Sequence, residues 1–96
     1  MKNQNNYKVG DIIRRLMKNP KLANKLEKLD ALEAWEEIIG KQICNYVKDQ
    51  RINKGILYVQ LKSAVIRNEL SYKKSEIITQ INQRIGKKLI VDLVLR

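Results

Sequence analysis

Hydrophobic residues recur along this chain at two periods, and the change between them divides the sequence into a helical first half and a mixed second half. In the first half, apolar side chains fall three or four positions apart, as on one face of a helix. This spacing predicts a short helix over residues 10–18 and a second helix that begins at Pro20, with Asn19 as its cap. The buried stripe of the second helix is expected to consist of Leu22, Leu26 and Leu29.

A further helical stretch surrounds the single tryptophan. Its apolar face consists of Leu32, Trp35, Ile39 and Ile43. Asp30 and Glu33 have the spacing of a capping box, so this stretch either begins a third helix or continues the second one. Trp35 is interpreted as a core anchor, because its neighbours on that face are aliphatic. Gly40 lies inside the pattern, where it costs ~1 kcal/mol relative to Ala unless it ends the helix or permits close packing.

Strand-like patterns follow after residue 45. Residues 46–52 predict a modest strand and residues 56–62 a stronger one, in which Leu57, Val59 and Leu61 alternate with outward side chains. The segment 53–55 between them is a short turn that ends in a glycine. Alternation returns in residues 89–96, which predicts a closing strand.

One helical pattern separates the second and third predicted strands. Ser63 is the expected cap of a helix whose apolar stripe includes Ile66, Leu70 and Ile81. The serines at positions 71 and 75 weaken this helix and predict a bend, and Gly86 is expected to end it. The predicted fold is therefore α+β, with N-terminal helices followed by β-β-α-β and a small three-stranded sheet. The expected core consists of Trp35, Ile39, Leu57, Val59, Leu61, Ile66, Leu70 and Ile81.

The length of the chain predicts one folded domain. With 96 residues it is near the lower limit for a single hydrophobic core. The first seven residues are polar and are expected to be flexible, so the predicted domain spans residues 8–96.

The charge balance indicates an anionic partner. Twenty Lys and Arg face ten Asp and Glu, which gives a net charge of +10. A nucleic acid, an acidic protein surface or an anionic lipid would each suit this charge. One helix and its exit loop concentrate candidate nucleic-acid contacts, although an ordinary basic helix surface would look similar. These candidates are Arg67, Tyr72, Lys73, Lys74, Lys87 and Lys88. The opposite charge gathers in Glu33, Glu36 and Glu37, for which a solvated helix face is sufficient explanation.

The residue inventory argues against enzymatic chemistry. The chain has no His and one Cys, so it holds neither a Ser-His-Asp or Cys-His arrangement nor a zinc-ligand set. No GxxxxGK[ST] or GxGxxG phosphate loop is present. We therefore expect a binding protein without cofactor, in which Cys44 is a small core hydrophobe. Lacking a signal-peptide or membrane-spanning apolar run, it is expected to be cytoplasmic.

A small three-stranded sheet with helices on one side is a frequent nucleic-acid platform, of which the KH domain is the best known. KH domains clamp the nucleic-acid backbone with a GXXG loop. Neither Gly40 nor Gly86 is followed by a second glycine three residues on, so the usual KH mode of binding is not supported.

Four segments in order resemble the DciA family of bacterial proteins. They are "VGDIIRRLM", "AWEEIIGKQI" with a W-x-x-I-x-G pattern, "GILYVQLKSAVIRNEL" and the closing "IVDLVLR". Many members have an aromatic residue where Ile66 stands, and "SAVIRNELSYKK" is similar to short, Bacteroidetes-type versions. The resemblance implies a KH-like α+β domain that contacts the replicative DNA helicase, assists its loading and has some affinity for DNA.

The sequence therefore favours two classes of function. The leading hypothesis is a non-enzymatic module that recruits the replicative helicase or assists its loading, with weak, sequence-independent nucleic-acid affinity. The alternative is an RNA- or DNA-binding protein unrelated to helicase loading. A small scaffold for another acidic protein is a third possibility.

Overall fold

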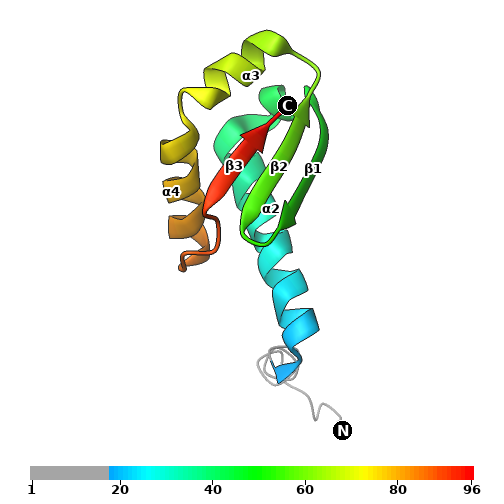
Figure 1. Ribbon diagram of the computed structural model, residues 1–96, viewed down its shortest axis with the longest axis vertical. Helices are drawn as coiled ribbons and strands as arrows, with labels where there is room; N and C mark the ends of the chain where they lie inside the picture. The colour runs from blue at the N-terminus through cyan, green and yellow to red at the C-terminus, as the bar shows by residue number, and fades with distance from the viewer. Residues whose placement is uncertain (1–17) are drawn as a thin grey trace, which may run out of the picture.

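The computed structural model describes residues 18–96, which form an α+β fold with one three-stranded sheet (Figure 1). Its elements are α2 (Pro20–Cys44), β1 (Val47–Asn53), β2 (Ile56–Leu61), α3 (Ala64–Ser71), α4 (Lys74–Ile85) and β3 (Asp92–Leu95). The strand order is β1-β2-β3, with β1 antiparallel and β3 parallel to β2. This confirms the predicted fold class. Of the helix expected over residues 10–18, residues 10–17 lie outside the described part.

The long helix α2 resolves the alternative at Asp30, since it runs through this residue without a new start. It begins as predicted: the side-chain oxygen of Asn19 accepts hydrogen bonds from the backbone N–H groups of Lys21 (3.0 Å) and Leu22 (3.4 Å). Near its end the helix is kinked at Gly40, whose φ of 83° and ψ of 163° are not helical. Only glycine adopts this conformation readily, so Gly40 turns the last part of α2.

The expected buried stripe at the start of α2 is wrong at two positions. Leu22 is 40% exposed and Leu29 is 55% exposed. The buried face of α2 carries Ala31, Ala34 and Trp35. At 100° per residue, Leu22 and Leu29 lie on roughly the opposite side of the helix. The first turns of α2 also extend beyond the end of the sheet (Figure 1). Helical spacing identified a leucine face, but packing in the fold buries another face of the same helix.

The predicted β-hairpin and the helix start that follows it are both present. β1 and β2 pair around a two-residue turn, Lys54-Gly55, in which both residues have positive φ. Two such residues form the turn whose twist suits a tight hairpin. Ser63 caps α3, because its hydroxyl accepts a hydrogen bond from the N–H of Ile66 at 3.3 Å.

The predicted bend separates α3 from α4, and α4 ends at Gly86 in the left-handed conformation. The closing strand is shorter than residues 89–96, since β3 begins only at Asp92. Asn82 explains the difference: its side chain accepts from the N–H of Ile90 (2.9 Å) and donates to the carbonyl of the same residue (2.9 Å). The backbone here is bound to α4, so Ile90 is buried while Val91 is 61% exposed.

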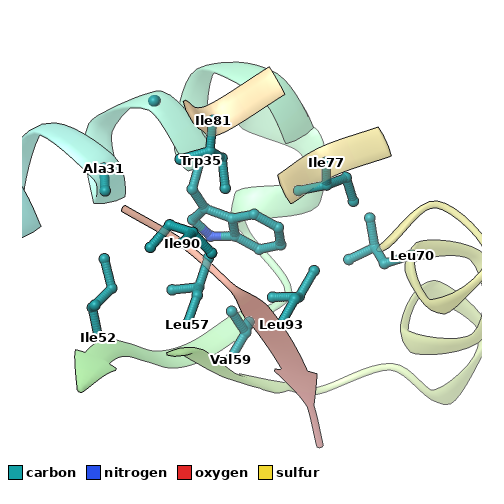
Figure 2. Close-up of a cluster of buried hydrophobic side chains, with 11 residues drawn as sticks. Ala31, Trp35, Ile52, Leu57, Val59, Leu70, Ile77, Ile81, Ile90 and Leu93 are labelled. Atoms are coloured by element: carbon teal, nitrogen blue, oxygen red, sulfur yellow. The ribbon is translucent and has the colours of Figure 1, made fainter. Parts of the chain in front are cut away.

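Trp35 occupies the centre of the core (Figure 2), between the sheet and α4. It is completely buried, and its indole N–H donates a hydrogen bond to the side-chain oxygen of Gln50 at 3.0 Å. Of the other expected core residues, four are buried: Leu57, Val59, Leu70 and Ile81. Three lie half-buried at its rim: Ile39, Leu61 and Ile66.

Candidate nucleic-acid interface

Four of the predicted contact residues lie on one projecting corner of the fold. We call Arg67, Tyr72, Lys73 and Lys74 the α3–α4 corner, since they lie on α3, on the link and on the first turn of α4. The N–H of Lys73 donates to the carbonyl of Leu70 at 3.0 Å, which tightens the turn. Leu70 and Ile77, both 4% exposed, anchor the two helices on either side of it.

Tyr72 is the most exposed of the large hydrophobic residues in the described part of the chain. It is 89% exposed and lies at the bend between α3 and α4. An aromatic side chain left in water gains nothing from hydrophobic burial, so its role is not in the core. Its two faces are available to a planar partner.

The cations of the corner differ in what they contact. Within residues 18–96, Arg67 and Lys73 are exposed and form no ion pair. Lys74 is half-buried, and its ammonium lies 3.8 Å from a carboxylate oxygen of Asp92. Two cations and one aromatic ring are therefore directly available here, with a third cation partly neutralised.

Lys87 and Lys88 do not join this cluster. They follow α4, a helix of 12 residues, and a helix of that length spans about 18 Å. The Lys87 ammonium pairs with the carboxylate of Glu27 on α2, so its charge is already compensated. The structure thus divides the predicted basic set into the α3–α4 corner and a separate pair at the other end of α4.

A groove of mixed polar and apolar lining adjoins the corner. Its volume is about 270 Å³, and its walls come from the end of α2 and from α3 and α4. The lining residues are Ile38, Ile39, Ile43, Leu70, Lys73, Glu76, Ile77 and Gln80. Five apolar side chains beside Lys73 offer a base a surface next to a cation, whereas Glu76 in the same lining opposes a phosphate.

The acidic residues occupy a different part of α2. Glu33, Glu36 and Glu37 are all exposed. Glu37 accepts a hydrogen bond from the Arg84 guanidinium at 3.2 Å, and Glu36 accepts one from the Gln50 amide at 3.2 Å. Two of the three carboxylates therefore already contact their own fold.

Cys44 lies half-buried at the end of α2, where its thiol donates a hydrogen bond to the carbonyl of Glu36 at 3.7 Å. Burial, followed by the negative charge of Glu36, raises the pKa of the Cys44 thiol. A raised pKa keeps the thiol protonated at neutral pH, which makes it a poor nucleophile.

Sequence patterns alone do not single out a second cluster, on the open face of the sheet. Arg51 pairs across the hairpin with Tyr58, and Arg96 follows β3 on the other side of the same tyrosine. The tight turn at residues 54–55 fixes the register that places Arg51 opposite Tyr58. This turn was the one sequence feature from which that pair could have been predicted. The contribution of Arg96 depends on the parallel pairing of β3, which sequence spacing does not specify.

Residues 18–96 contain no group of three or more acidic or cysteine side chains placed to hold a metal ion. No helix among them is both long and apolar enough to cross a membrane.

The described residues form a small α+β fold in a basic chain. The chain belongs to the DciA family: the family model described as "Dna[CI] antecedent, DciA" matches residues 8–95. No curated protein matches the chain. DciA proteins are non-catalytic helicase loaders, so membership implies a role in loading the replicative helicase and an interaction with the DnaB-type helicase.

Proposed function

We propose that this domain, in addition to the helicase-loading role of its family, binds single-stranded DNA or RNA without sequence preference. We propose that the α3–α4 corner is the binding surface. The observation that carries the proposal is the 89% exposure of Tyr72, which is adjacent to Lys73 and follows Arg67 of α3 by five residues. A loader brings a helicase to a strand, so weak affinity for that strand favours the encounter.

The chemistry of the corner favours single strands over duplex. Arg and Lys neutralise phosphates and release counterions, which gives affinity without reading sequence. A tyrosine ring stacks on any base that is not already stacked in a duplex. The groove beside Lys73 offers apolar surface for the same base. Nothing in this arrangement distinguishes one base from another, so we expect weak sequence preference.

Charge removal at the corner tests the proposal. The variant Arg67→Gln, Lys73→Gln, Lys74→Gln leaves the core residues untouched and should remain folded. Its binding to a labelled oligo(dT) is measured by fluorescence anisotropy over a range of salt. Each lost phosphate contact should flatten the plot of log affinity against log salt by ~0.7. The control is Lys87→Gln, Lys88→Gln, which removes two positive charges at the other end of α4 and should keep the wild-type slope.

Tyr72 is tested separately. Tyr72→Ala should weaken single-strand binding by ~1–3 kcal/mol through lost stacking, whereas Tyr72→Phe keeps the ring and should bind like wild type. A corner variant that binds oligo(dT) with the wild-type affinity and salt slope would remove the corner from the interface. Comparison with oligo(rU) then establishes whether DNA or RNA is preferred.

A further inference from the structure

The outer face of the sheet carries an arginine-tyrosine-arginine cluster. Alternation along β2 turns Leu57 and Val59 into the core and Tyr58 to the opposite face. The guanidinium carbon of Arg51 lies 5.5 Å from the centre of the Tyr58 ring, and that of Arg96 lies 5.8 Å from it. One ring therefore holds two cations, one from each neighbouring strand.

This face is open within the described structure. The strands lie in front of α2 in Figure 1, so the view is onto the side that α2 does not cover. The helices pack on the other side, where the buried side chains of the sheet point. A hollow of about 130 Å³ opens on the outer face beside the cluster; it is lined by Asp49, Arg51, Tyr58, Val59, Gln60 and Arg96.

The two guanidinium groups are preorganised to bind an oxyanion. Stacking on an aromatic ring restrains an arginine side chain while its N–H edge stays available for paired hydrogen bonds. Neither Arg51 nor Arg96 forms an ion pair with residues 18–96. Two like charges beside one ring repel each other, and a shared anion relieves that repulsion.

Phosphate is the anion that fits this arrangement. Guanidinium groups match the geometry of phosphate oxygens and bind them in pairs. The Gln60 amide in the same hollow is a neutral hydrogen-bonding group. Asp49 is the one acidic side chain of the hollow, and its charge opposes an anion there.

We propose that Arg51 and Arg96, held on the ring of Tyr58, form a phosphate-binding site on the open face of the sheet. The site is separate from the α3–α4 corner and does not depend on it. Its phosphate comes either from the backbone of a nucleic-acid strand or from a free nucleotide. Tyr58 acts as a positioning residue, because it orients the two guanidinium groups.

The test follows the backbone amides of the full chain by NMR during three titrations. The probes are inorganic phosphate, ATP and an oligo(dT) without terminal phosphates. We expect at least one probe to shift the amides of Arg51, Tyr58 and Gln60 together. Shifts with oligo(dT) identify a strand as the source, and shifts with ATP alone identify a nucleotide. A titration in which none of the three probes moves these amides refutes the site.

Variants of opposite expected effect sharpen the test. The double variant Arg51→Gln, Arg96→Gln should lower the affinity for the probe that binds at least about tenfold, as expected for lost hydrogen bonds between charged groups. Asp49→Asn should strengthen it, because a repelling charge is removed. The control Lys21→Gln with Lys25→Gln removes the same two charges at the exposed start of α2 and should change affinity less than about twofold.

Tyr58 separates positioning from simple charge. Tyr58→Phe keeps the ring and should retain binding, whereas Tyr58→Leu releases both arginines and should weaken it with the net charge unchanged. Unaltered affinity in the double arginine variant, or weaker binding in Asp49→Asn, would overturn the proposal. The site is independent of the proposed function if the corner variant loses oligo(dT) binding while the amides of Arg51, Tyr58 and Gln60 still shift with phosphate or ATP.

Discussion

Trp35 offers the most direct test of how this small domain is held together. Its side chain is fully buried among Leu57, Ile81 and Leu93, which are themselves fully buried. Replacing a buried aromatic side chain with alanine costs roughly 3–5 kcal/mol, because apolar contacts are lost and a cavity remains. The total stability of a domain is only about 5–15 kcal/mol. Trp35→Ala should therefore remove a large part of the stability.

The hydrogen bond of the indole contributes the smaller share. Its acceptor, Gln50, is half-buried and also contacts Glu36, so water can replace the lost donor. A bond of this kind contributes ~1 kcal/mol. We expect Gln50→Ala to cost ~1–3 kcal/mol, because it leaves the fully buried indole N–H without its acceptor. A cost below that of Trp35→Ala identifies packing rather than hydrogen bonding as the main effect of the tryptophan.

Urea unfolding followed by far-UV circular dichroism measures both changes. A loss of roughly 4 kcal/mol corresponds to a fall of roughly 2–3 M in the midpoint for a small domain. The control is Tyr72→Ala, which truncates an exposed aromatic residue and should change stability by less than about 0.5 kcal/mol. A Trp35→Ala midpoint equal to that of Tyr72→Ala would refute the reasoning. So would native fluorescence typical of an indole in water.

Two further predictions concern α2. Gly40→Ala should destabilise the domain by ~1–3 kcal/mol, because the positive φ and extended ψ of Gly40 strain any other residue. In an ordinary helix interior the same substitution would stabilise by ~1 kcal/mol. The sign of the change in the urea midpoint therefore tests the kink. Replacing Glu33, Glu36 and Glu37 together with Gln should lower stability by no more than ~1 kcal/mol. These side chains are exposed, and only Glu37 among them forms an ion pair in the described part of the chain. A loss of several kcal/mol in thermal or urea unfolding would contradict a solvated face.

Local signals in the sequence predicted the elements well. Asn19 and Ser63 are helix caps because their side chains accept hydrogen bonds from the next turn, a property of a few adjacent residues. Gly86 ends α4 for an equally local reason, the left-handed backbone that glycine tolerates. The change of hydrophobic period located the hairpin for the same reason, because strands and helices expose their faces at different spacings.

Features that depend on distant packing were not predictable in this way. The strand β3 starts late because Asn82, on α4, binds the backbone of Leu89 and Ile90. The arginine-tyrosine cluster requires the register of three strands at once. Each of these depends on contacts between elements, which residue spacing along the chain does not encode.

Helicase loading in the presence of a corner variant tests the central claim most directly. The measurement is the amount of the purified replicative helicase bound to circular single-stranded DNA, with the domain absent, added as wild type, or added as Arg67→Gln, Lys73→Gln, Lys74→Gln. Wild type should increase loading, and the variant should still bind the helicase in solution but give less of the increase. Equal loading by the variant would contradict a nucleic-acid role of the corner, and no increase with wild type would contradict the loading role.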